Sequence, residues 1–400
     1  MATPLRIGIA GAGVLGRLLA WRLGRAGHAV TVFDPAPGPQ PPAIGALQPA
    51  HTGAAGFTAA GMLSPIAELD NAGPALARQG WRSLALWRGI AEALRGQGCA
   101  APLFVQQGSL LLAHGSDLGA ARRVLARLEA ATARAAELPT PQPLDRAALA
   151  ALEPALAPGL HAWLLPQEAQ VMGRDMLQAL AVHAPRVHWC WGERVTRLEP
   201  HALEVAGEGM QRFDLAIDVR GAGARPDLPV RGVRGEVVWL HAPGLRLQRP
   251  LRLLHPRHRV YIVPRPGDLC VIGASEIESE DRSPVSLRSA VELMAAAQSA
   301  LPELAEARIV HMEANLRPAL PDNAPRIDHA PGLLRINGLF RHGWLLAPAL
   351  VEDALERIGL PPAPLRGVPP PVPEGGHHLG PGQARSPAVL DPSLAPVTPC

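Results

Sequence analysis

Residues 5–16 read LRIGIAGAGVLG, and they decide the fold. The first six form a short apolar run, which predicts a buried strand of a parallel sheet. The glycine turn after it leads into leucines at helical spacing that continue to Gly27, a residue suited to the C′ position of a helix. A second apolar run, residues 29–33 (AVTVF), ends at Asp34. The stretch therefore predicts a β-α-β unit at the start of an α/β protein.

The glycine turn has the GxGxxG spacing of a dinucleotide-binding motif. Gly11 permits the tight bend, Gly13 lets a pyrophosphate approach the backbone, and Gly16 lets helix and strand pack closely. Unpaired N–H groups at the helix N-terminus would face the phosphates, and Asp34 would accept hydrogen bonds from an adenosine ribose. The first helical residues of this turn are Val14 and Leu15. We predict a Rossmann-type dinucleotide domain. The motif alone does not separate FAD from NAD, and a purely structural glycine turn is the alternative.

Composition limits the class of protein. The chain has 400 residues and a mass of 42.2 kDa, which is long for one core and predicts two lobes or more. Apolar residues make up 48% and charged residues 18%, as in a globular protein. The net charge is +3, and all 38 basic side chains are arginine. Because no basic cluster with interleaved aromatic residues occurs, we expect no nucleic-acid partner.

Cysteine usage and hydropathy exclude further classes. The four cysteines, Cys99, Cys190, Cys270 and Cys400, are scattered and form no CxxC pair, so we expect neither a disulfide framework nor a metal site. No apolar run reaches about 18 residues without an arginine or proline, so we expect no membrane span. No charged-then-apolar leader precedes the first strand, and we therefore expect a cytoplasmic protein.

The rest of the chain alternates between helical and strand patterns. Helices are predicted over residues 81–94, 118–136, 174–182, 284–301 and 344–358. Residues 104–113 (FVQQGSLLLA) predict a hairpin-like pair of strands. Further strands are expected over residues 194–198, 213–219, 233–238, 260–265 and 333–336. A second glycine turn, at Gly221 and Gly223, follows one of them.

The C-terminal forty residues differ from everything before them. Residues 361–400 are rich in proline, contain no Phe, Trp or Tyr, and show no periodicity. Such a segment cannot bury enough apolar surface to offset its ordering entropy. We predict that it is a disordered tail.

Four stretches beyond the first turn carry a family resemblance. They are residues 58–68 (TAAGMLSPIAE), 260–265 (VYIVPR) with 272–275 (IGAS), 316–322 (LRPALPD) and 338–348 (GLFRHGWLLAP). The first resembles the flavin-contacting loop of the D-amino-acid oxidase superfamily, in particular its glycine oxidase branch from thiamine biosynthesis. All four occur in the family's order, so the resemblance covers about residues 5–360.

The resemblance implies an α/β flavoprotein with a discontinuous FAD-binding domain and an α+β substrate domain. The expected FAD-binding domain comprises residues 1–85, 150–225 and 312–360. The expected substrate domain comprises residues 86–149 and 226–311. Residues 361–400 are the tail.

The resemblance also implies the cofactor and the residues that contact it. Relatives that attach flavin covalently use a cysteine in the stretch matching residues 315–322, where this chain has none, so we expect noncovalent FAD. Gly343 precedes the last helix, which would direct its positive end at the flavin pyrimidine edge. By the same resemblance, further FAD contacts are expected from Ala60, Gly61, Met62, Val195, Gly221, Gly223, His342, Trp344 and Leu345.

Three residues are candidates for work on the substrate. By resemblance, Arg317 binds the substrate carboxylate, and a planar guanidinium can grip it through two parallel hydrogen bonds. Tyr261, the one tyrosine of the chain, would face the same carboxylate. Arg341 lies in the flavin-facing turn. The alternatives are a solvated surface charge for either arginine and a half-buried packing residue for Tyr261.

The chain departs from the family pattern at three places. Arg259 stands where some members carry a histidine, and Glu276 stands where the glycine oxidases have a methionine near the pocket. A carboxylate at Glu276 would attract a larger or amine-bearing substrate, which puts strict glycine preference in doubt. The loop between residues 35 and 57 is longer than expected.

The expected reaction is oxidative deamination of glycine or another small amino acid or amine. A hydride passes from Cα to flavin N5, the imine or glyoxylate and ammonia form, and oxygen is reduced to peroxide. The imine would serve thiamine thiazole biosynthesis. The alternatives are a D-amino-acid dehydrogenase, an N-methylglycine (sarcosine) oxidase, a noncatalytic nucleotide sensor and an NAD-dependent dehydrogenase. Whether the protein forms a homo-oligomer stays open.

Overall fold

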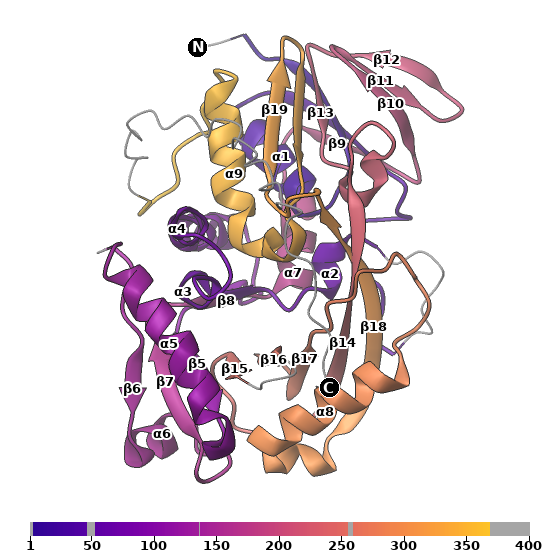
Figure 1. The fold of residues 1–400 in the computed structure, drawn as a ribbon. Helices are drawn as coiled ribbons and strands as arrows, with labels where there is room; N and C mark the ends of the chain where they lie inside the picture. The colour runs from indigo at the N-terminus through magenta and orange to yellow at the C-terminus, as the bar shows by residue number, and fades with distance from the viewer. Residues whose placement is uncertain (1–2, 46–52, 136, 255–258, 369–400) are drawn as a thin grey trace, which may run out of the picture. The chain divides into compact units, whose positions relative to one another are not determined.

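The N-terminal turn lies at the carboxyl edge of a six-stranded sheet. The computed structural model describes residues 3–45, 53–135, 137–254 and 259–368, drawn in colour in Figure 1. The strand order is β19-β20-β13-β1-β2-β9, with every neighbouring pair parallel except β19 and β20. The strands are β1 (Arg6–Ala10), β2 (Ala29–Asp34), β9 (Val187–Trp191), β13 (Leu215–Asp218), β19 (Arg326–Ala330) and β20 (Leu333–Asn337).

Helices cover one face of this sheet. Alternate strand residues, such as Ile7 and Ile9, pack into one buried core with four helices, as the period of two requires. Helix α9 lies beside α1 and α4, as Figure 1 shows. The helices are α1 (Val14–Arg25), α4 (Pro74–Gly96), α7 (Gly173–Val182) and α9 (Gly343–Arg357).

A small antiparallel sheet covers the other face. Ala10 and Phe33, which point away from the helices, pack against Val195 and Leu203 of this sheet. Its strands are β10 (Val195–Glu199), β11 (Ala202–Val205) and β12 (Gly209–Arg212). The arrangement is a three-layered Rossmann-type unit, and the predicted α/β class is confirmed.

A second, eight-stranded sheet has the order β18-β14-β17-β16-β15-β5-β7-β6. Helix α8 (Leu287–Ala300) packs on one face against Val238 and Ile262. The opposite face carries Trp239 and Tyr261. The strands are β5 (Ser109–Ala113), β6 (Gln142–Leu144), β7 (His161–Leu165), β14 (Arg231–His241), β15 (Leu251–Leu254), β16 (Arg259–Arg265), β17 (Leu269–Gly273) and β18 (Arg308–Ala319).

Another small sheet and the remaining helical segments complete the described fold. A three-stranded sheet, β3-β8-β4, consists of Met62–Leu63, Ala169–Val171 and Phe104–Val105. Helix α5 (Leu118–Thr132) contacts the single-turn helix α3 (Pro65–Glu68). The remaining helical segments are α2 (Ala55–Thr58), α6 (Arg146–Leu152), η1 (Gly115–Asp117), η2 (Gly221–Ala224), η3 (Pro302–Glu306) and η4 (Phe340–His342).

The hairpin expected over residues 104–113 is wrong. β4 pairs with β8, and β5 pairs with β7 and β15. Between them, Gly108 has a φ of +78° and donates its N–H to the carbonyl of Glu168 at 2.9 Å. Apolar periodicity marks the two strands but carries no information about their partners.

The division into two domains stays a prediction, and two elements of the structure do not follow its predicted borders. Helix α4 runs without a break across residue 85, and β7 lies in the eight-stranded sheet although residues 150–225 were assigned to the FAD-binding domain. The tail prediction begins too early, because Leu365 is buried and Val368 packs against the same core. Residues 369–400 lie outside the described residues.

Within the described ranges, no helix has the length and apolarity that a bilayer crossing requires. Nor do these ranges contain a group of three or more His, Cys, Asp or Glu side chains that could hold a metal ion.

Candidate active site

The three glycines of the N-terminal turn have different reasons for being glycine. Gly11 has a φ of +103°, and a Cβ there would lie 2.6 Å from the carbonyl oxygen of Val219. A Cβ on Gly16 would lie 1.8 Å from the carbonyl oxygen of Gly11. Among the described residues, a Cβ on Gly13 would meet only the Ala54 side chain, at an ordinary 3.7 Å. The protein's own packing therefore explains Gly11 and Gly16 but not Gly13, as expected if Gly13 leaves room for a bound group.

The surroundings of this turn fit a dinucleotide. Helix α1 has no side-chain cap and no acidic residue in its first turn, so Val14 and Leu15 present their N–H groups without competition from a carboxylate. The Asp34 carboxylate accepts hydrogen bonds from the N–H groups of Ala12, at 2.6 Å, and Ala36, at 2.8 Å. Those bonds fix it at the end of β2, where a carboxylate still has lone pairs for a ribose.

A buried arginine, which the sequence analysis did not identify, braces the same turn. Arg17 donates to the carbonyls of Ala12 at 2.7 Å, Pro39 at 2.8 Å and Leu177 at 2.9 Å. Its guanidinium also lies over the ring of Trp191. Burial lowers the pKa of Arg17 to about 10, although the nearby charge of Asp34 opposes that change. Arg17 thus joins α1 to the loop after β2.

The other predicted cofactor contacts fall into two groups. Gly221 and Gly223 form η2 after β13, the strand beside β1, so they lie near Gly11. Val195 is a buried residue of β10, on the opposite side of the sheet from α1. In the second group, Ala60, Gly61 and Met62 form the turn into β3, and Ala60 and Met62 pack against the cluster that contains Tyr261.

The N-terminus of α9 lies beside the loop around α2. The Trp344 indole donates to the Gly56 carbonyl at 3.1 Å, and Leu345 packs close to Gly80 of α4. Apart from its chain neighbours and the backbone of α9 itself, no atom of the described part of the chain lies within 4 Å of a Cβ built on Gly343. The buried Nδ1 of His342 has no hydrogen-bond partner among the described residues. A polar group of a bound cofactor would satisfy that atom, so this region also fits the expected FAD.

Arg341 belongs to an ionic cluster centred on Glu68. The Glu68 carboxylate accepts hydrogen bonds from Arg341 at 2.6 Å and Arg252 at 3.2 Å, and His342 Nε2 lies 3.0 Å from it. Burial alone would raise the pKa of Glu68. The hydrogen bond with His342 and the charges of Arg252 and Arg341 outweigh burial and hold that pKa well below its usual range. Glu68 is therefore an anion that fixes both arginines.

A second buried carboxylate, Glu168, holds the helix that carries Glu68. Glu168 accepts hydrogen bonds from the N–H groups of Ile66 at 3.0 Å and Ala67 at 3.2 Å, and from the Ser109 hydroxyl at 2.5 Å. Burial outweighs these bonds and raises the pKa of Glu168 to about 7.

This raised pKa predicts a pH-dependent stability. Between pH 4.5 and about 7 the folded protein holds a proton on Glu168 that the unfolded chain has released. The contribution of Glu168 to the free energy of unfolding therefore falls as pH rises through this interval, by roughly 3 kcal/mol in total. The Glu168→Gln variant keeps a hydrogen-bond acceptor but has no titrating group at this position. Its free energy of unfolding, relative to that of wild type, should therefore increase between pH 5 and pH 8. Urea midpoints at both pH values measure this, with Glu129→Gln on the exposed face of α5 as control. Parallel profiles for wild type and Glu168→Gln would rule the idea out.

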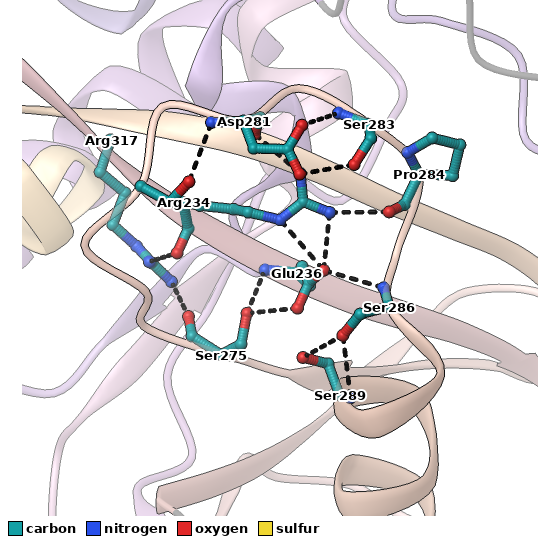
Figure 2. A network of polar contacts seen from close by, with 10 residues as sticks. Arg234, Glu236, Ser275, Asp281, Ser283, Pro284, Ser286, Ser289 and Arg317 are labelled. Atoms are coloured by element: carbon teal, nitrogen blue, oxygen red, sulfur yellow. Dashed lines mark hydrogen bonds and ion pairs between the residues drawn. The ribbon is translucent and has the colours of Figure 1, made fainter.

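Arg317 lies on β18 and is held by backbone carbonyls, as Figure 2 shows. Its two terminal nitrogens donate to the carbonyl of Arg234 at 3.2 Å and to that of Ser275 at 3.0 Å. Burial lowers the pKa of Arg317, while the neighbouring Tyr261 and Glu276 oppose that change and Arg341 reinforces it. The predicted candidates Tyr261 and Arg341 therefore both lie close enough to Arg317 to affect its pKa.

A buried network supports the carbonyls that hold Arg317. Glu236 accepts hydrogen bonds from the Arg234 guanidinium at 2.7 Å and from the Ser275 hydroxyl at 2.9 Å. The Ser286 N–H donates to the same carboxylate at 3.0 Å (Figure 2). Because Arg234 and Glu236 are both buried and paired, they form a rigid base behind Arg317.

Two glycines make room for the site side chains. A Cβ on Gly235 would lie 2.4 Å from a terminal nitrogen of Arg317, and one on Gly273 would lie 2.5 Å from the Tyr261 hydroxyl. Burial raises the pKa of Tyr261, against the lowering effect of Arg317, so the phenol stays neutral and able to donate. Neither glycine belongs to a motif from which this role could be predicted.

We therefore expect Gly235→Ala to displace Arg317 without unfolding the protein. The methyl group would meet the end of a flexible side chain, so Arg317 moves and β14 does not. Loss of an aligned charged contact should raise KM for an amino-acid substrate roughly tenfold, with the cofactor still bound. Steady-state kinetics and thermal melting measure both parts. Gly119→Ala in α5, where a Cβ meets nothing within 4 Å, is the control. An unchanged KM for Gly235→Ala would contradict this account.

The fold and the turn define a Rossmann-type dinucleotide-binding protein that also contains a cluster of paired arginine and glutamate side chains. Comparison with known proteins makes the assignment specific. The family described as FAD dependent oxidoreductase (DAO) matches residues 6–356, and the chain belongs to this family. The protein is thus an FAD-dependent oxidoreductase, and the NAD-dependent alternative is wrong.

Three relatives illustrate the similarity. A protein of Rhizobium etli described as a thiamine biosynthesis oxidoreductase, ThiO, is 37% identical over 88% of this chain and 96% of its own length. The crystal structure of glycine oxidase from Geobacillus kaustophilus has a TM-score of 0.73 and 27% identity, covering 89% of this chain and 95% of that one. That of iminodiacetate oxidase from Chelativorans sp. BNC1 has a TM-score of 0.73 and 25% identity, covering 90% and 98%.

Proposed function

We propose that this protein oxidises glycine, or a similarly small amino acid, to the imine and so serves thiamine thiazole biosynthesis. The relatives described as ThiO and as glycine oxidase support this substrate class. The observation that carries the proposal is that Arg341, in η4, lies near Arg317 and Tyr261, which belong to the eight-stranded sheet. Tyr261 lies on the face of that sheet that also packs against Ala60 and Met62. We further propose oxygen as the electron acceptor and the cytoplasm as the location.

Each side chain has a distinct task in this proposal. Arg317 grips the substrate carboxylate, and its two backbone carbonyls fix the plane of the grip. Tyr261 donates a hydrogen bond to the same carboxylate, since its phenol stays neutral. FAD, when bound, accepts the hydride from Cα at N5. A substrate that arrives with a neutral amine needs no general base.

Product analysis in air tests the proposal. The purified holoprotein should convert glycine to glyoxylate, ammonia and hydrogen peroxide in equal amounts, and added NAD should change nothing. D-Alanine and sarcosine, assayed in parallel, test the D-amino-acid dehydrogenase and sarcosine oxidase alternatives. If either is turned over and glycine is not, glycine oxidation is the wrong assignment.

We also expect the FAD to be noncovalent. No cysteine occurs in residues 315–322, and among the described residues the cysteines are Cys99, Cys190 and Cys270. Acid or heat denaturation should therefore release all of the yellow colour into the supernatant. Flavin that stays with the precipitated polypeptide would show that this expectation is mistaken.

A further inference from the structure

The acidic residue Glu276 lies beside the arginines of the candidate site. Glu276 follows Ser275, whose carbonyl accepts the hydrogen bond from Arg317 and whose hydroxyl donates to Glu236 (Figure 2). The N–H of Ser275 also donates to the Glu236 carbonyl, at 3.3 Å. The backbone that carries Glu276 is therefore fixed against Arg317 and cannot drift from it.

The Glu276 carboxylate lies close to the guanidinium group of Arg341. One of its oxygens is 3.6 Å from a terminal nitrogen of Arg341, and its negative charge also acts on Arg317. Its side chain is 49% exposed, so the carboxylate is accessible from solvent. Glu276 thus partly neutralises Arg341, the cation that a second carboxylate of a substrate would need.

The net charge of the ionic side chains around Arg341 suits a substrate that has one carboxylate. Arg252 and Arg341 contact Glu68, Arg341 contacts Glu276, and Arg317 interacts with Glu276 and Arg341. These five side chains comprise three guanidinium groups and two carboxylates, which leaves one positive charge. Arg317 can use that charge for one substrate carboxylate. A second one would meet Arg341 already paired with two anions.

We propose that Glu276 is a specificity-determining residue that restricts the site to amines with a single carboxylate and rejects dicarboxylic amines. This inference rests on the proposed function, in which Arg317 binds the substrate carboxylate. A dicarboxylic amine places its second carboxylate beside Glu276, and like charges brought together are strongly unfavourable. Replacing Glu276 by glutamine removes that repulsion and leaves Arg341 with Glu68 as its remaining carboxylate in this group.

Two matched substrates test the inference. Sarcosine and iminodiacetate are secondary amines that differ in the second carboxylate alone. Wild type should prefer sarcosine in kcat/KM, and Glu276→Gln should shift the ratio toward iminodiacetate by about 10-fold or more. Glu278→Gln removes a nearby exposed carboxylate that pairs with Arg231 at 3.1 Å, and it should keep the wild-type ratio. An equal shift in both variants would show a general charge effect and overturn the inference, as would no shift in Glu276→Gln.

A binding measurement separates this inference from the proposed function. Titration of the holoprotein with acetate and with malonate, followed by the flavin absorbance, needs no turnover. Glu276→Gln should strengthen malonate binding relative to acetate about 10-fold, and Glu278→Gln should not. If no amine is oxidised but malonate binding shifts, the charge selection stands and the proposed function fails. If glycine is oxidised and the binding ratio stays constant, the proposed function stands and the selection by Glu276 is wrong.

Discussion

Arg317→Leu is expected to abolish oxidation of glycine while FAD stays bound. The guanidinium is the group that aligns a carboxylate, and a charged hydrogen-bonded contact is worth roughly 1.5–3 kcal/mol, or about 10- to 150-fold. Misalignment of Cα with the flavin should add further loss. Peroxide formation under steady state measures the activity, and the bound flavin spectrum measures the cofactor.

Two comparisons identify the cause of that loss. Arg317→Lys should recover part of the activity, because an ammonium restores the charge but not the planar fork that contacts the carbonyls of Arg234 and Ser275. In the leucine variant, the oxidation rate of a simple amine without a carboxylate should fall much less than that of glycine. If Arg317→Leu oxidises glycine at nearly the wild-type rate, the carboxylate lies elsewhere.

Gly13→Ala should weaken FAD binding without harming the fold. Gly13 has a φ of −74° and a ψ of −163°, which alanine also adopts, and the new methyl group meets protein atoms at an ordinary distance. A pyrophosphate that approaches this backbone would collide with the methyl group. Overpacking of this kind costs about 1–3 kcal/mol, which corresponds to FAD affinity reduced about 5- to 150-fold.

Equilibrium dialysis of FAD against the apoprotein measures this effect. The urea midpoint of the Gly13→Ala apoprotein should equal that of wild type. Gly16→Ala should instead destabilise the protein itself, because its methyl group would lie 1.8 Å from the Gly11 carbonyl oxygen. Gly119→Ala should change neither quantity substantially. Wild-type FAD affinity in Gly13→Ala would mean that the pyrophosphate does not contact this turn.

Local patterns predict the parts of the fold that depend on neighbours in sequence. The turn from β1 into α1, the strand that ends at Asp34 and the last helix are all local, and the structure contains each of them. The pairing of β4 and β5 is not local. β4 pairs with β8 and β5 with β7, about sixty positions later, and β5 also pairs with β15, in the register Leu110 to Leu251. Periodicity cannot report such partners, and the hairpin prediction failed for that reason.

The same distinction between local patterns and distant contacts applies to the residues of the site. Arg317, Tyr261 and Arg341 could be proposed from motif resemblance, one residue at a time. The role of Glu68 could not be predicted, because its partner Arg341 is 273 residues away in the sequence. The roles of Gly235 and Gly273 depend on the atoms that face them across the sheet, which no sequence spacing reveals.

Anaerobic addition of glycine to the purified yellow protein tests both the substrate and the role of Arg317. The flavin should lose its visible absorbance in wild type, and Arg317→Leu should stay yellow under the same conditions. Readmission of oxygen should restore the wild-type colour with formation of hydrogen peroxide. A wild-type flavin that remains oxidised with excess glycine would show that glycine is not the substrate, and an Arg317→Leu variant that bleaches as fast as wild type would show that Arg317 does not bind it.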